Sequence, residues 1–209
     1  MRKKLSRNIE SLVVTDINSK GMGVAKDTSG AVYFIKETIP GDVVNINVYK
    51  KRRGYFEAQP TAFLKKSPHR VTPPCTHFGL CGGCKWQHFE YAQQLKFKEA
   101  GVLRNLQKIG KVNPEETLPI MAAPDAYWYR NKLEFSFSTN RWLTPAEVES
   151  KEEHIRLGLG FHKPGRWDKI VSIDTCHLQI EPSNKIRNAL RDFAIEEQIP
   201  FFDLQQQRG

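Results

Sequence analysis

Long hydrophobic runs are absent from this sequence of 209 residues. The basic start is followed by an apolar run that spans only residues 12–14, which is too short for the hydrophobic segment of a secretory signal. No stretch approaches the roughly 18 apolar residues that a membrane helix needs. We therefore expect a cytoplasmic protein without a membrane partner.

Acidic residues are few in the first third of the chain. Residues 1–74 contain 6 Asp and Glu against 14 Lys and Arg, whereas residues 75–209 contain 17 against 18. Nearly all of the net charge of +9 thus belongs to the N-terminal third. Such an asymmetry indicates that this part meets a polyanion such as RNA. A basic surface that merely keeps the protein soluble is the alternative.

Helical periodicity is missing between residues 8 and 64, where short alternating segments are separated by glycines. The period-two alternation typical of strands is visible in two sets of residues, Val13/Thr15/Ile17 and Val44/Ile46/Val48. Five short strands within about 55 residues predict a small closed barrel of the OB-like kind. We therefore assign residues 1–64 to a barrel whose curved basic surface is available to single-stranded RNA.

A second domain of α+β type is expected over residues 75–209, after an extended linker of residues 65–74 that holds three prolines. An amphipathic helix with its core on one face and lysines on the other is predicted over residues 89–110. Its apolar positions are Tyr91, Leu95, Val102, Leu106 and Ile109.

Antiparallel strands are predicted further along, over residues 127–139 and 155–173, and a Pro-Gly turn joins the second pair. A last helix over residues 183–198 is expected to be capped by Ser183.

Cysteine is scarce, with four in the chain, and their spacing is C-x5-C-x2-C followed after 91 residues by Cys176. Thiols stay reduced in the cytoplasm, so a metal explains this cluster better than disulfides do. Three close cysteines, Cys75, Cys81 and Cys84, with a distant fourth are a common arrangement for a cubane iron–sulfur cluster. Gly82 and Gly83 would let the backbone fold tightly and point amides at sulfur.

Structural zinc is the competing interpretation of the cysteines. Zinc sites more often use two paired C-x2-C knuckles, and only Cys81 and Cys84 form such a pair. A mixed Cys/His zinc site stays open because three histidines are close in the sequence to a cysteine, namely His77, His88 and His177.

A family resemblance rests on several motifs together: "GMGVA" and "IPGDVV" in the barrel region, "CxxxxxCGGCxWQH" followed by "YxxQLxxK", "YRNK", and "VxIxxCxLQ". The sequence resembles the TRAM-containing, S-adenosylmethionine (SAM)-dependent RNA uracil-5 methyltransferases of the iron–sulfur 23S rRNA type. The resemblance implies that residues 1–64 are an RNA-binding TRAM barrel. It also implies that Cys75, Cys81, Cys84 and Cys176 hold a [4Fe-4S] cluster in a central domain.

The same resemblance implies a Rossmann-like methyltransferase domain, which supplies the SAM site, a cysteine nucleophile and a carboxylate base. We expect that domain to be absent from this chain, because it holds no fifth cysteine and no G-x-G-x-x-G motif. The glycines between Gly158 and Gly165 read as a hairpin. We therefore assign no catalytic and no SAM-binding residue here, and expect an inactive N-terminal portion of a longer enzyme.

Candidate RNA contacts gather in "YKKRRGYF", where four consecutive cations that could grip phosphates are flanked by three aromatic rings that could stack bases. We assign this role to Lys50, Lys51, Arg52, Arg53, Tyr55 and Phe56. A solvated basic hairpin with a core aromatic residue is the alternative. Arg130 and Lys132 are further candidates, which could hold RNA as the target base leaves its stack. The expected partner is rRNA first and tRNA second, bound by a monomer.

Two other function classes remain at this point. One is a non-catalytic RNA-binding module with a structural iron–sulfur or zinc site. The other is a radical-SAM RNA-modifying enzyme, but there the TRAM domain follows the catalytic part and the cluster motif is C-x3-C-x2-C, and neither feature fits this sequence.

Overall fold

The computed structural model of the chain describes residues 6–209 and divides into two compact units. The first unit combines Met1–Thr72 with Lys85–Ala123, and the second combines Pro73–Cys84 with Pro124–Gly209. Each unit is described separately below.

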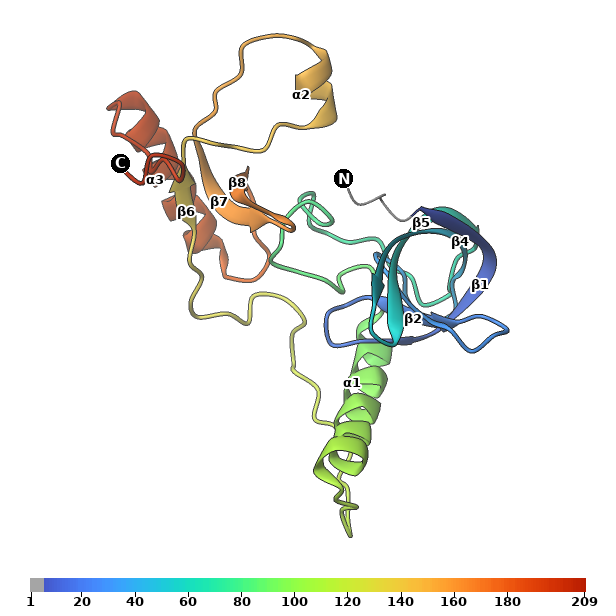
Figure 1. Cartoon of the computed structure of the whole chain (residues 1–209). Coiled ribbons are helices and arrows are strands. Elements are labelled where there is room, and N and C mark those ends of the chain that lie inside the picture. Colours follow the sequence, from blue (N-terminus) through green and yellow to red (C-terminus); the bar gives the residue numbers. More distant parts are fainter. Residues whose placement is uncertain (1–5) are drawn as a thin grey trace. The chain divides into compact units, whose positions relative to one another are not determined.

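Five strands close into a barrel in the first unit (Figure 1). They are β1 (Arg7–Ile17), β2 (Gly23–Lys26), β3 (Val32–Ile35), β4 (Val43–Arg52) and β5 (Tyr55–Lys65). Their order around the barrel is β1-β2-β3-β5-β4, and β4 pairs with β1 to complete the ring. All pairs are antiparallel except that of β3 with β5. The predicted five-stranded closed barrel is confirmed.

Alternate side chains of the strands fill the barrel. In β4 the predicted period holds, because Val44, Ile46 and Val48 are buried. In β1 the predicted alternating set begins at Val13, and there the alternation does not match the core. Val13 is 51% exposed, while its neighbours Leu12 and Val14 are buried. The pairing of β1 with β2 shifts register between Val14 and Asp16, and such a bulge changes which residues face inward.

The segment after β5 is attached to the barrel by a buried carboxylate. Asp42 is fully buried and accepts hydrogen bonds from the Ser67 backbone amide at 2.9 Å and from Arg70 at 2.8 and 2.7 Å. Burial raises the pKa of Asp42, but Arg70 and the backbone amides of Ile39 and Ser67 more than offset this, so the pKa lies below its ordinary value. Residues 67–70 of the expected linker are therefore fixed in place.

A second cluster of the first unit joins the helical segment to the barrel. Its buried members are Ile17, Ile39 and Phe89, and Trp86 and Phe97 pack against them. An ion pair between Arg104 and Asp16 adds a polar contact. These contacts explain why residues 85–123 group with the barrel, whereas the sequence pattern placed them with the second domain.

The predicted helix of this segment forms as α1 (Tyr91–Asn105), extended by one π-helical turn, η1 (Leu106–Gly110). Its predicted core face is wrong. No residue of α1 or η1 is buried, and Val102 and Ile109 are 59% and 78% exposed. The contacts with the barrel cluster come instead from Phe97, which lies outside the predicted apolar stripe.

The second unit contains a three-stranded antiparallel sheet, β6 (Ser136–Ser138), β7 (Gly158–Lys163) and β8 (Arg166–Ser172), in that order. The predicted hairpin of β7 and β8 is confirmed, and Gly165 in its turn has the positive φ of 77° that favours glycine. Residues 127–135, predicted as part of a strand, form none. A short helix, α2 (Pro145–Glu149), begins with a capping box between Thr144 and Glu147.

The last helix, α3 (Glu181–Glu196), contacts β7. It begins two residues earlier than predicted, with Ile180 at the N-cap and Pro182 in the first turn. Ser183 is therefore not the cap. Proline is favoured at this position because its φ suits a helix and it lacks an amide that the first turn would leave unpaired. Among the helices of residues 6–209, none is long and apolar enough to cross a membrane.

Candidate functional site

Three cysteines lie on the irregular loop between Cys75 and Cys84 in the second unit. Successive turns shape it, with the amides of Leu80 and Cys81 both donating to the carbonyl of His77. The amide of Gly83 donates to Cys81 Sγ at 3.2 Å, the kind of contact expected of the glycine pair. A Cβ at Gly82 would lie 2.9 Å from the backbone oxygen of His162, so the loop approaches the hairpin closely there.

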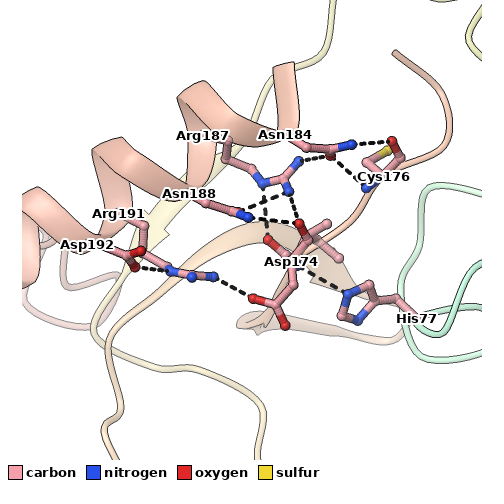
Figure 2. Close-up of polar contacts among 9 residues, drawn as sticks. His77, Asp174, Cys176, Asn184, Arg187, Asn188, Arg191 and Asp192 are labelled. Atoms are coloured by element: carbon pink, nitrogen blue, oxygen red, sulfur yellow. Dashed lines mark hydrogen bonds and ion pairs between the residues drawn. The ribbon is translucent and has the colours of Figure 1, made fainter. Parts of the chain in front are cut away.

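The fourth cysteine, Cys176, follows β8 and is held by α3 (Figure 2). Its backbone amide donates to Asn184 Oδ1 at 2.8 Å, and Asn184 Nδ2 donates back to the Cys176 carbonyl at 3.3 Å. The cysteine loop reaches the same segment, because the Asp174 amide donates to His77 Nε2 at 3.2 Å. Polar contacts thus connect the loop, the end of β8 and α3 within one unit.

Three of the four cysteines, Cys81, Cys84 and Cys176, belong to one apolar cluster or pack against it. Cys176 is buried with Val171, Ile173 and Leu178. Partly buried residues pack around them: Leu80, Cys81, Cys84, Leu133, Trp142 and Phe161. Burial, with smaller contributions from the nearby Cys84, Cys75 and Cys176, raises the pKa of the Cys81 thiol to about 11. The Cys81 thiol would therefore need a metal to become a thiolate at neutral pH.

Metal-ligating geometry is not assembled here: within residues 6–209 no group of three or more His, Cys, Asp or Glu could hold a metal ion. The residue types do fit a thiolate centre, with four cysteines, an amide directed at sulfur and an apolar surround. The histidines fit less well. His88 belongs to the other unit, and His77 Nε2 already accepts the Asp174 amide.

The predicted basic segment forms the β4–β5 hairpin of the barrel. Lys50, Lys51, Arg52 and Arg53 are all exposed. Arg52 pairs with Glu57 at 2.8 Å, which leaves the other three cations without a carboxylate contact among the ion pairs of the described chain. The tip of this hairpin is thus a compact cationic surface.

The two aromatic residues of this hairpin point to different environments. Phe56 stacks on the buried Tyr33, with ring centroids 5.3 Å apart, and packs against the barrel core. Tyr55 instead lies 4.4 Å from the ring of the half-buried Phe34. Sequence reasoning missed Phe34, because only the parallel pairing of β3 with β5 brings it beside Tyr55.

The other two candidate RNA contacts lie in the second unit. The Arg130 amide donates to the Leu178 carbonyl at 2.8 Å, which places Arg130 beside the irregular segment after β8 that carries Cys176. Its guanidinium lies 5.9 Å from the Tyr129 ring. Lys132 is fully in solvent contact and pairs with Glu134 at 2.7 Å. The structure therefore brings Arg130 close to the cysteine segment within its unit.

Comparison with known families agrees with the barrel geometry. Residues 8–61 match the TRAM domain. The barrel is a TRAM domain. The match spans β1 to the middle of β5, which includes the basic hairpin and the Phe34–Tyr55 pair.

Relatives cover nearly the whole chain. A protein of Bacteroides thetaiotaomicron named an uncharacterized RNA methyltransferase is 42% identical over 192 residues, which are 91% of this chain and 42% of the relative. The 23S rRNA (uracil(1939)-C(5))-methyltransferase RlmD of Xanthomonas axonopodis pv. citri is 39% identical over 137 residues. That match covers 65% of this chain and 31% of the relative. The chain thus spans less than half the length of these relatives.

A solved structure is similar as well. The Pyrococcus abyssi tRNA (uracil-54, C5)-methyltransferase, in complex with S-adenosyl-L-homocysteine, superposes with a TM-score of 0.59 and 25% identity. The superposition covers 94% of this chain and 39% of that one.

These findings correct the expected fold class. We expected a chain from which the methyltransferase domain is absent, but proteins named RNA methyltransferase align with 91% of it and a solved methyltransferase with 94%. The expectation rested on the missing fifth cysteine and on one missing glycine motif. The glycines at residues 158–165 belong to the β7–β8 hairpin, so their pattern carries no information on a cofactor domain. The expectation of an inactive fragment rested on the same absent domain and therefore loses its support as well.

Proposed function

We propose that this protein acts in the SAM-dependent methylation of uracil at C5 in RNA, which forms 5-methyluridine. The observation that carries this is the similarity over most of the chain to proteins named RNA methyltransferase. The name of the Xanthomonas relative makes 23S rRNA the first substrate to test, and the Pyrococcus structure makes tRNA the second. The bound S-adenosyl-L-homocysteine of that structure supports SAM as methyl donor. We place the reaction in the cytoplasm and expect a monomer.

The TRAM barrel binds the RNA in this proposal. Lys50, Lys51 and Arg53 would contact phosphates, whose neutralisation releases counterions and dominates affinity. The Phe34–Tyr55 pair would give a neighbouring base a ring to stack on, while Phe56 supports the hairpin from the core. Arg130 and Lys132 would contact RNA from the second unit.

The four cysteines hold a [4Fe-4S] cluster in this proposal, and the cluster supplies a cross-link of four thiolate bonds. Supporting observations are the shared apolar cluster, the Gly83 amide at Cys81 Sγ and the spacing in the sequence. Such a cross-link would join the loop of Cys75–Cys84 to the end of β8, two segments that are about 90 residues apart and costly to order otherwise. Zinc in place of the cluster is an outcome that metal analysis would reveal.

Deletion of the gene tests the function without assuming where the active site lies. Mass spectrometry of ribosomal and transfer RNA from the deletion strain should show loss of 5-methyluridine at one site, first expected in 23S rRNA. Re-expression of the intact gene should restore it. Re-expression with Lys50, Lys51 and Arg53 replaced by Ala should restore it only in part. Unchanged 5-methyluridine in both RNA classes would instead favour a non-catalytic RNA-binding module.

A further inference from the structure

An arginine is buried next to the cysteine segment without a carboxylate contact (Figure 2). Arg187 of α3 is 4% exposed. Its guanidinium donates to the backbone oxygens of Ile173 and Asp174 at 3.0 and 2.6 Å, and to the side-chain oxygens of Asn184 and Asn188 at 3.0 and 3.1 Å. The face of its guanidinium lies 5.0 Å from the Phe135 ring. Every one of these partners is uncharged.

The nearest carboxylate is engaged elsewhere. Asp174 Oδ1 accepts from Arg191 at 2.7 Å, and Arg191 also pairs with Asp192 at 2.9 Å. Arg191 thus contacts two carboxylates. Arg187 lies one helical turn earlier and is in none of the ion pairs of residues 6–209. Burial lowers the pKa of Arg187, and the strongest opposing influence is Cys176, ahead of Asp174 and Glu181. Arginine nevertheless stays charged in proteins.

A buried cation without a counter-ion is costly, because water no longer solvates it and uncharged dipoles replace that solvation only in part. An anionic group beside it would offset this cost. Four cysteine thiolates make a metal centre negative overall, whether the metal is zinc or a cubane iron–sulfur core. Arg187 holds the backbone at Ile173 and Asp174, three and two residues before Cys176, so it is placed to face such a centre.

We propose that Arg187 is the built-in counter-cation of the metal centre formed by Cys75, Cys81, Cys84 and Cys176. This inference rests on the proposed metal centre and adds a residue to it that no comparison assigns. Arg187 is a positioning residue in this role. It orders the Cys176 segment through the two backbone oxygens and stabilises the negative charge of the loaded centre.

The test measures charge rather than folding. The protein is loaded anaerobically with ferrous iron and sulfide, and the midpoint potential of the centre is compared between variants. Loading with Co²⁺ alone, followed by thiolate-to-metal absorption, gives a second measure that needs no redox step. Removal of the positive charge in Arg187→Met should make the centre about tenfold harder to reduce, a shift of about 59 mV for a one-electron couple. Co²⁺ affinity should fall about tenfold.

Two further variants separate charge from structure. Arg187→Lys keeps the charge but loses the planar fork that contacts both backbone oxygens. We expect the equilibrium constant for reduction and the Co²⁺ affinity to stay within about threefold of the wild-type values. The thermal stability of the metal-free protein should be reduced. Arg191→Met/Asp192→Asn is the matched control on the same helix, because it removes a cation together with one of its two carboxylate partners and so conserves the net charge; it should leave the potential unchanged.

The outcomes are distinguishable. If Arg187→Met fails to fold while Arg187→Lys folds with a wild-type potential, the charge role is supported. If Lys and Met lower the potential and affinity equally, or neither changes them, or both fail to fold, Arg187 is not a counter-cation. If the wild type takes up neither iron–sulfur nor Co²⁺, the proposed metal centre itself is wrong.

Discussion

The barrel and the cysteine-containing unit differ in how they are held together. In the barrel, strands close a complete ring and nine buried side chains fill it, none of them charged. The second unit has three strands and long irregular segments, and its cluster includes a cysteine among four buried members. Its helix is joined to that cluster through Asn184 and Arg187, which are buried polar residues. The first unit therefore has the larger apolar core, whereas the cluster of the second is joined to its helix by polar contacts and, in our proposal, is held by metal.

Loss of a proposed ligand should break this comparison most strongly. In Cys81→Ser the metal should be lost, and amide hydrogen exchange should accelerate throughout β7, β8 and α3 because the cross-link between loop and strand is gone. Exchange in the barrel strands should stay unchanged. Iron, sulfide and zinc analysis together with exchange mass spectrometry measure both effects. Wild-type protein stripped of metal by a chelator is the control and should behave alike. Equal exchange in Cys81→Ser and in the metal-loaded wild type would show that metal does not hold this unit together.

Loss of the Arg70–Asp42 ion pair should destabilise the barrel about as much as a mutation in its apolar core. Arg70→Met leaves the fully buried Asp42 without its cation, which should reduce the free energy of unfolding of the first unit by about 3–5 kcal/mol. Asp42→Asn in the same chain should recover part of the loss, since no charge is then left unpaired. The free energy of unfolding is measured by denaturant titration with near-UV circular dichroism as the signal. A loss below about 1 kcal/mol would mean that solvent reaches Asp42.

The same Arg70–Asp42 pair should make the barrel less stable at low pH. The pKa of Asp42 is lower in the folded state, so its contribution to stability is present above the ordinary value of 3.8 and is lost as the pH falls through the folded pKa. The double variant Arg70→Met/Asp42→Asn should lack this part of the acid transition. An identical acid profile in both proteins would assign the acid limit to other groups.

Periodic patterns explain what could be predicted from the sequence. Val44, Ile46 and Val48 alternate in the sequence and are buried, because strand geometry alone sets that period. The exposure of Val13 and Ile109 could not be predicted from periodicity in the sequence. A bulge in β1 and the choice of Phe97 as the contact residue depend on neighbours distant in the sequence.

The cysteine spacing was visible in the sequence, but the residues that hold it were not. Asn184 and Arg187 contact backbone atoms of Cys176, Ile173 and Asp174, and backbone partners leave no trace in residue type. The start of α3 was misplaced for a local reason. Ser183 is a favoured cap, but Pro182 before it already fits the first helical turn.

The cationic hairpin offers the next comparison, now in RNA binding. Replacement of Lys50, Lys51, Arg52 and Arg53 by Ala should weaken RNA binding about 100-fold at 0.1 M salt, if three of them each contribute about 0.7 to the slope against log salt. Arg52 should contribute least because it is paired with Glu57. Fluorescence anisotropy with a single-stranded RNA, repeated over a salt series, measures both quantities. An Arg130→Ala/Lys132→Ala variant tests the second unit in the same assay. Unchanged affinity and slope in the hairpin variant would place the main binding surface elsewhere.

Aromatic stacking should give the smallest effect and a different signature. Phe34→Ala should weaken binding about tenfold, at the lower end of the 1–3 kcal/mol that stacking contributes per base. Because no charge is removed, the salt slope should stay as in the wild type, in contrast with the hairpin variant. Phe34→Leu is the matched control, since it retains apolar contact with Tyr55 but offers no ring. If Leu binds as the wild type does, Phe34 only supports Tyr55 and does not stack on a base. If Phe34→Ala also flattens the salt slope, the substitution has displaced the cations of the neighbouring strand, and the affinity loss then reports hairpin geometry.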